Sequence, residues 1–600
     1  MVAEFDYLPE NCTESHNHPF LCAEGGHLAS WMNRQCQRAT KGKPMMFLNM
    51  ARDRQQRRSI YLSNLALFIL SIALVTFVTA LALRRSLQSG RLSIPPFYDD
   101  VTYLYWSQSV LHAAPRQSIF ATAYQMLDQH SPLTTLFGFV GYSLINAGDI
   151  GPYIVAAIHL MLFVFACVLV LRRLPAMAVI GTAFAICAIP ALSNFATEFR
   201  PEPAWASFTA VSVIAFFALD IFEGGARIRQ IGLGLLVGLA VISKPTTSPF
   251  TIIVLGTAFL ASGLAYYHEK RIGGSPPSIR VIVTGAATLW AAALLVIIPI
   301  SAIIGRDIYH YIMWVMRDIS DQFGSREGFV GQSLFYSFGI GGQQMLGRAL
   351  PVLLAIWGLG FGYVVLWRRS TLPRILALFV VVLISYTIPS VAAVKSVWFG
   401  SAFDAIFIIA TVYLIALLYE PFAEPSSHPP ARAMISALVG IAGVGLFLAS
   451  SPSWERSRVF EMDPDSRAEV TDRTARIWAV LREHELVRMH SEPQGHVSNV
   501  MTIAVKPITG YVINLYAVKD GLPMRDIDLT YARSLDELLD KLPNFDYVVV
   551  QPSFQHFLSG ASLGASLSNA MNGRPDFSRI ASLPLQEPGA VANIYERKIP

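Results

Sequence analysis

Long apolar runs separated by short polar connectors fill the chain from about residue 59 to residue 450. The first run, residues 60–83, is long enough to cross the ~30 Å hydrocarbon core of a bilayer as a helix. Further runs cover approximately residues 132–148, 152–171, 176–193, 204–222, 229–243, 248–266, 281–304, 349–367, 375–393, 401–419 and 433–450. The pattern predicts a polytopic α-helical membrane protein with about 11–13 transmembrane helices.

Basic residues gather in the connectors beside these runs, which the positive-inside rule places in the cytoplasm. Four arginines directly precede the first run, so the N-terminus is expected in the cytoplasm and residues 84–131 form the first external loop. The other basic connectors hold Arg172–Arg173, Arg227, Arg229, Lys270–Arg271, Arg280, Arg368–Arg369, Arg374 and Arg432. These connectors agree only if residues 132–171 cross the membrane an odd number of times. Either 132–148 is re-entrant, or the first of these connectors breaks the rule. The C-terminus is expected outside.

Composition supports a membrane protein and argues against a nucleic-acid binder. The chain is 53% hydrophobic and 14% charged, with a mean hydropathy of +0.45, whereas soluble domains average about 25% charged residues. The net charge of +5 is small for 600 residues, and the basic residues follow the connectors rather than forming a patch. Five cysteines are too few for a disulfide framework.

Residues 1–58 hold no apolar run that could span a membrane, and we expect a disordered cytoplasmic extension. The extension contains Cys12, His16, His18, Cys22, His27 and Cys36, whose spacing fits no standard zinc pattern. Translation from Met45, Met46 or Met50 would remove this set altogether. No metal site is predicted.

Residues 451–600 are charged, lack a spanning run and are expected to form a small α/β domain outside the membrane. Residues 473–488 have helical periodicity, and residues 534–540 begin with a capping pattern. Residues 511–516 and 545–550 are expected to form strands. The domain shows no catalytic motif, so we expect it to cover the active site or to recruit an acceptor.

Two adjacent carboxylates, Asp99 and Asp100, follow the first span in the loop of residues 84–131. Transfer of a sugar from a polyprenyl phosphate needs a base for the acceptor, and either acid can supply it. Neighbouring residues of a helix do not share a face, so one acid is expected to reach the acceptor while the other caps the helix or orients its partner. The ordinary alternative is that both cap a helix over residues 101–111.

Four more charged segments are expected on the same side, at residues 198–202, 243–246, 305–348 and 394–398. Charges at the edge of a membrane are costly, and they mark functional sites unless they serve as snorkelling or capping residues. The cations expected to bind the leaving phosphate are Lys244, Arg317, Arg326 and Lys395, with Arg200 as a weaker candidate. His130, before the second run, either positions the acceptor or starts a helix.

In order and spacing, these motifs resemble the GT-C class of integral-membrane glycosyltransferases. The resemblance is nearest to the branch of protein O-mannosyltransferases and lipid A aminoarabinose transferases. It covers about residues 55–420 and rests on Asp99–Asp100, His130–Leu133, Arg200–Glu202, Gly238–Pro245, Tyr311–Val315 and Ala393–Lys395. The sequence departs from the family at Asp100, where glutamate is usual, and at Ser131, where proline is usual.

The resemblance implies an enzyme of the bacterial inner membrane that takes a sugar from a polyprenyl-phosphate donor on the external face. The acceptor is a lipid, a glycan or a protein. Asp99 would be the general base with Asp100 in support, and His130, Arg200, Glu202, Lys244, Arg317, Arg326 and Lys395 would bind substrates. No cofactor is expected, because the chain shows no dedicated metal cluster, although some relatives use a divalent metal.

Two other classes of protein remain open. A flippase for lipid-linked sugars would also need cations and aromatics facing a headgroup, but it has no need for the acid pair. The chain also lacks the internal repeat that many transporters show. A non-catalytic scaffold is disfavoured because burying unused charges is costly.

Overall fold

The computed structural model describes residues 63–598 with short gaps. The gaps are 97, 146, 224, 273–277, 318–327, 393–394, 420–428, 451–463, 492–494, 504–509, 530–531, 533, 554–561 and 586–589. The predictions for residues 1–58 and for Arg326 lie outside the described residues.

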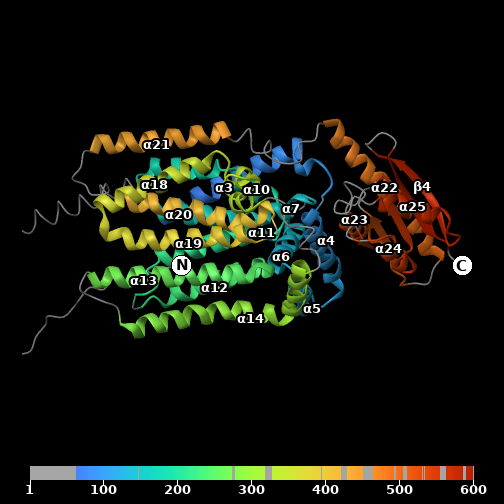
Figure 1. The fold of residues 1–600 in the computed structure, drawn as a ribbon, viewed down its shortest axis with the longest axis horizontal. Helices are drawn as coiled ribbons and strands as arrows, with labels where there is room; N and C mark the ends of the chain where they lie inside the picture. Colours follow the sequence, from blue (N-terminus) through green and yellow to red (C-terminus); the bar gives the residue numbers. More distant parts are fainter. Residues whose placement is uncertain are drawn as a thin grey trace, which may run out of the picture. The chain divides into compact units, whose positions relative to one another are not determined.

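Each apolar run predicted from the sequence is helical in the structure (Figure 1). The helices of the bundle are α3 (Asn64–Ser89), α6 (Pro132–Leu144), α7 (Ile150–Ala156), α8 (Ile158–Val170), α9 (Ala176–Cys187), α10 (Pro190–Thr197), α11 (Pro201–Ala218), α12 (Arg227–Ser243), α13 (Ser248–Ile272), α14 (Ile279–Arg317), α18 (Ala349–Trp367), α19 (Leu372–Val391), α20 (Ser401–Tyr419) and α21 (Pro429–Ser450).

Eight helical segments of the described chain are long and apolar enough to cross a membrane, so the protein is multi-pass. The count becomes nine if α9 and α10, which bend by 64° at their junction, form one broken span. It stays below the expected 11–13 partly because some predicted runs give short helices. The run 132–148 contains only the 13 residues of α6, which extend about 20 Å. Helix α12 has 17 residues.

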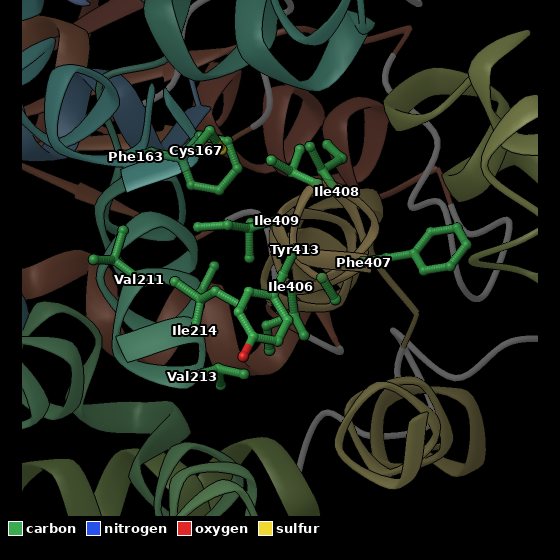
Figure 2. Packing of buried hydrophobic residues seen from close by; sticks show 14 of the residues in the cluster. Phe163, Cys167, Val211, Val213, Ile214, Ile406, Phe407, Ile408, Ile409 and Tyr413 are labelled. Carbon is green, nitrogen blue, oxygen red and sulfur yellow. The ribbon is translucent and has the colours of Figure 1, made fainter. Parts of the chain in front are cut away.

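Helices α11 and α20 form the centre of the bundle and are buried on nearly every side. A helix that is hydrophobic all round is expected in this position. Figure 2 shows Ile406 and Ile409 of α20 facing Val211 and Ile214 of α11, while Phe407 points away from them. The two helices are therefore held together by van der Waals packing of apolar side chains, because within a bilayer the surrounding lipid is as apolar as the side chains themselves.

Between α3 and α6 the chain forms a short 3-10 turn, η1 (Arg91–Ser93), and the helices α4 (Tyr98–Ala113) and α5 (Ile119–Leu127). Helix α4 packs on α6, and the hydroxyl of Ser107 donates to the carbonyl of Thr135 over 3.2 Å. Ser131, the residue before α6, donates a hydrogen bond to the Ser243 carbonyl at the end of α12. Figure 1 shows α4, α5, α6 and α7 gathered at one end of the bundle.

The C-terminal domain is α/β, as expected. Its helices are α22 (Pro464–Ser491), α23 (Gly510–Asp520), α24 (Leu535–Lys541) and α25 (Leu563–Asn572). Its strands β1 (Ser498–Ile503), β2 (Met524–Asp528), β3 (Tyr547–Val550), β4 (Phe577–Pro584) and β5 (Val591–Arg597) form one sheet in the order β2-β1-β3-β5-β4. Strand β1 pairs in parallel with β2 and β3, whereas β5 pairs antiparallel with β3 and β4.

Three of the four local predictions for this domain are confirmed, and one is wrong. Helix α22 covers residues 473–488, β3 lies within 545–550, and the Ser534 hydroxyl caps α24 by accepting from the N–H of Glu537. Residues 511–516 belong to helix α23 instead of a strand. The side chain of Asn514 makes two hydrogen bonds to the backbone of Asp526 in β2, and this tertiary anchoring outweighs the β-propensity of the segment.

The C-terminal domain contacts the bundle at α4 and α7. Helix α23 packs along α4, where the rings of Tyr105 and Tyr511 lie 6.1 Å apart. The Lys519 ammonium lies 2.6 Å from both carboxylate oxygens of Asp149, directly before α7. The helix that carries the acid pair is therefore supported by both parts of the protein.

Candidate active site

Asp99 and Asp100 occupy the first turn of α4 but have opposite surroundings. The side chain of Asp99 is 59% exposed, whereas that of Asp100 is 1% exposed. Consecutive residues of a helix point about 100° apart, so one acid can reach solvent while its neighbour faces the protein. The structure thus separates the two acids that the sequence places side by side.

Asp99 begins a row of four charged side chains that alternate in sign. Its carboxylate pairs with the guanidinium of Arg200. The Nε atom of Arg200 lies 3.0 Å from one oxygen of Glu202, and the Nζ atom of Lys244 lies 2.8 Å from the other. Both Glu202 and Lys244 are buried. We call Asp99, Arg200, Glu202 and Lys244 the charge row.

Helix ends position the charge row. Arg200 occupies the N-cap position of α11, Pro201 begins the helix, and Glu202 lies in the first turn, where the helix dipole favours a carboxylate. Lys244 is the C-cap of α12, and Pro245 prevents the helix from continuing. The residue types at these ends therefore fix where each charge lies.

Aromatic rings line the charge row. The Arg200 guanidinium lies 5.0 Å from the ring centre of Trp398, and the Lys244 ammonium lies 4.6 Å from that of Phe399 and 5.5 Å from that of Trp205. Rings at such distances attract cations and keep water away from them. Electrostatic interactions are stronger in such a site than in open solvent.

Asp100 belongs to a second cluster that is closed to solvent. One of its oxygens lies 2.7 Å from the guanidinium of Arg91, which also pairs with Glu198. The other oxygen accepts from the hydroxyl of Tyr153 and from the backbone N–H of Phe199, each over 2.9 Å. This arrangement holds α4 against η1 and the start of α11, and it fits a structural acid.

His130 lies between α5 and α6 in contact with two aromatic rings. Its ring centre lies 5.7 Å from that of Trp106 and 5.5 Å from that of Tyr311. Burial lowers the pKa of His130 below its usual 6.5, and this effect outweighs the opposing influence of Asp307 and Asp128. The imidazole is therefore neutral near pH 7 and can donate or accept a hydrogen bond.

The remaining predicted cations occupy different places. Lys395 donates to the carbonyls of Pro389 and Ser390 over 2.8 and 2.6 Å, and it lies 5.5 Å from the ring centre of Tyr336. It also precedes the 3-10 turn η5 (Val397–Gly400), which carries the rings beside the charge row. Arg317 is exposed at the end of α14, and none of the contacts described above for the charge row involves it.

Several residues of these two clusters were not among the predicted site residues. They are Arg91, Tyr153, Glu198, Trp205 and Phe399. Glu198 lies within residues 198–202, which the sequence indicated as a charged segment at a membrane edge, so it could have been predicted as a site residue. Arg91 carried no signal, since nothing in the sequence shows that residues 91, 100 and 198 meet.

No group of three His, Cys, Asp or Glu side chains within the described ranges could hold a metal ion. The candidate cysteines and histidines of the N-terminal extension lie outside those ranges. Independence from a metal therefore stays a prediction.

No protein-family model matches the chain, and no curated protein matches it significantly. Its fold is that of the GT-C integral-membrane glycosyltransferases, which confirms the resemblance indicated by the motifs. The chain is similar to ArnT, the lipid A aminoarabinose transferase, from Cupriavidus metallidurans in the apo state, with a TM-score of 0.51 and 13% identity over 88% of this chain and 97% of ArnT. The structure of ArnT bound to undecaprenyl phosphate gives a TM-score of 0.50 and 12% identity over the same shares.

Proposed function

We propose that the protein is a membrane glycosyltransferase that moves a sugar from a polyprenyl-phosphate donor to an acceptor hydroxyl on the external face of the bacterial inner membrane. The observation that carries the proposal is the charge row, which ends in an exposed carboxylate and holds two fixed cations among aromatic rings. That combination supplies a base and an anion-binding site within one connected set of side chains.

Asp99 is the general base in this proposal. The acceptor oxygen attacks the anomeric carbon of the donor, the bond from that carbon to the phosphate oxygen breaks, and the polyprenyl phosphate leaves with the electron pair. The acceptor proton passes to the Asp99 carboxylate, whose exposure leaves it open to the acceptor. A single displacement of this kind inverts the anomeric centre.

Lys244 and Arg200 stabilise the negative charge that develops on the leaving phosphate, and Lys395 adds a third cation from the neighbouring segment. Glu202 binds the first two through separate oxygens and keeps them in place before the substrate arrives. Fixed charges in a site that excludes water cost no reorganisation during the reaction. ArnT, whose fold this chain shares, binds undecaprenyl phosphate, which supports a lipid phosphate as the donor carrier.

The alternative from a different class is a flippase for lipid-linked sugars. It would use the same cations and rings, but it gives no role to an exposed carboxylate at the end of the row. Replacing Asp99 therefore separates the two functions.

The test is a transfer assay with purified protein in nanodiscs. Radiolabelled polyprenyl-phosphate sugars are offered with a membrane extract as the acceptor, and wild type is compared with Asp99→Asn. We expect label to move to an acceptor with wild type only, and donor binding to be equal in the two proteins. Donor binding without transfer by either protein would reject the enzyme and favour the flippase.

A further inference from the structure

A cavity of about 280 Å³ lies on the Asp100 side of α4, and none of the roles assigned above uses it. The segment of residues 91–96 forms one wall, and Asp100, Asp149 and Tyr153 form another. Thr471 of α22 and Tyr516 of α23 complete the lining from the C-terminal domain. A space of this size is close to that of ordinary small-ligand sites.

Other protein groups fix the polar groups of the lining in place. Asp149 is held by Lys519 and accepts a hydrogen bond from the hydroxyl of Tyr142 over 2.7 Å. The Tyr153 hydroxyl donates to Asp100, and the Thr471 hydroxyl donates to the carbonyl of Arg467. Asp100 is 1% exposed and enclosed by its protein partners, whereas the Asp149 side chain is 26% exposed, so its carboxylate keeps lone-pair sites for a ligand. Contacts within the protein therefore orient these polar groups before a ligand binds.

The lining suits a neutral, hydroxyl-rich molecule. The two carboxylates of the lining, Asp100 and Asp149, are already paired with Arg91 and Lys519, so the lining carries no excess positive charge that would favour a phosphate over an uncharged ligand. The lining is mixed, with Leu92, Ile94 and Ile150 beside the polar groups. A wholly apolar chain is disfavoured because the Asp149 carboxylate and the hydroxyls of Thr471 and Tyr516 would lose their hydration against it. Tyrosine and proline faces beside carboxylates can contact the C–H surface of a sugar ring while its hydroxyls are hydrogen-bonded.

The cavity also lies beside the proposed base. Asp100 lines it and Asp99 is the next residue, with consecutive Cα atoms about 3.8 Å apart. No residue of the charge row lines the cavity, so the two sites can take different substrates of one reaction. The cations of the row suit the donor phosphate, and the cavity suits an uncharged part of the acceptor.

We propose that this cavity binds a saccharide portion of the acceptor, so that the acceptor is a glycan. This inference rests on the proposed transferase function and specifies the acceptor class that the charge row leaves open. It also gives the C-terminal domain a role, since that domain supplies Thr471 and Tyr516 to the lining.

The test measures binding first and transfer second. Wild-type protein in nanodiscs is examined by saturation-transfer NMR with the methyl glycosides of mannose, galactose and arabinose. Thr471→Trp fills the cavity from an exposed helix position. The matched control is Glu483→Trp, which adds the same ring at an exposed position of α22 outside the lining. We expect at least one glycoside to bind wild type, Glu483→Trp and Asp99→Asn alike. Thr471→Trp should bind it about tenfold more weakly or worse.

Transfer kinetics then separate the two proposals. With the glycan fraction of the membrane as acceptor, Thr471→Trp should raise the acceptor KM by about tenfold and leave release of the sugar to water unchanged. The proposal of a saccharide site is wrong if no glycoside binds wild type, or if Thr471→Trp binds and transfers as wild type does. Either result would leave the transferase function standing if transfer itself is observed. Saturation of the cavity by the peptide trialanine instead of the glycosides would assign it to a protein acceptor and overturn the inference. Glycoside binding without any transfer or sugar release would reject the transferase function and leave a saccharide-binding cavity.

Discussion

The two neighbouring aspartates of α4 show how the same residue type acquires different roles within one helical turn. Asp99 is exposed and ends a row of charges that reaches Lys244, whereas Asp100 is buried against Arg91 and Tyr153. The chemical group is the same in both. The helix geometry directs one side chain toward solvent and the other toward the protein. The residues that each carboxylate contacts then determine its role.

The two clusters also differ in how their charges balance. The charge row holds two acids and two cations, so a phosphate can bind by adding to a neutral set. In the cluster of Asp100, Arg91 and Glu198, the Arg91 guanidinium pairs with both acids, and backbone and hydroxyl donors also bind Asp100. The charge row can accept a charged ligand, whereas the Asp100 cluster depends on Arg91 for its stability.

The largest effect is therefore expected from Arg91→Met. This change leaves Asp100 and Glu198 as two buried carboxylates without their shared cation, and breaking a buried pair costs about 3–5 kcal/mol. Thermal unfolding in detergent should show a strongly lowered melting temperature. The control is Arg317→Met, which removes an exposed arginine and should leave the melting temperature unchanged. Equal stability of the two variants would contradict a structural role for the Asp100 cluster.

Lys244→Met should affect the reaction more than the fold. Glu202 keeps its contact with Arg200 in this variant, but the donor phosphate loses a charge-assisted hydrogen bond worth about 1.5–3 kcal/mol. The donor KM should rise about 10–100-fold, as measured by steady-state transfer kinetics. Lys270→Met, at a half-exposed lysine of α13, is the matched control and should keep the wild-type KM. An unchanged donor KM in Lys244→Met would remove this lysine from the phosphate site.

Sequence patterns could predict the helices but not the partners of the acids. The apolar runs appear as helices because a bilayer offers the backbone no hydrogen-bond partners, so an apolar segment must pair its own N–H and C=O groups. The sequence also indicated Arg200, Glu202 and Lys244 as site residues, because each charge lies at the edge of an apolar run beside a proline. The sequence therefore predicted all four residues of the charge row as candidate site residues.

The sequence could not show which of the two acids would be buried. That outcome depends on Arg91 and on the backbone of Phe199, which is 99 residues away from Asp100. The strand predicted for residues 511–516 is wrong for a related reason, because contacts of α23 with α4 and β2 outweigh the β-propensity of the segment. Long-range contacts of this kind leave no local signature.

A smaller effect is expected from Lys395→Met. Lys395 is tied to the end of α19 by two carbonyls and lies beside the turn that carries Trp398, so it can approach the charge row. Loss of one cation at the edge of the site should raise the donor KM by about tenfold. Arg317→Met should not change it. If Arg317→Met has the larger effect, Arg317 rather than Lys395 belongs to the phosphate site.

The smallest effect is expected for His130, which lies outside both clusters. Burial lowers the pKa of His130 in the folded protein, so the unfolded chain takes up this proton first as the pH falls below about 6.5. Above that pH the neutral imidazole makes its full contribution to the stability of the fold. This contribution is lost as the pH falls toward the lower pKa that His130 has in the folded protein. His130→Gln should therefore flatten the decline in melting temperature between pH 7 and pH 5, whereas His112→Gln, at an exposed histidine of α4, should keep the wild-type slope. A wild-type slope in His130→Gln would show that protonation of other groups weakens the fold at low pH. The contacts of His130 with Trp106 and Tyr311 would then hold in either charge state.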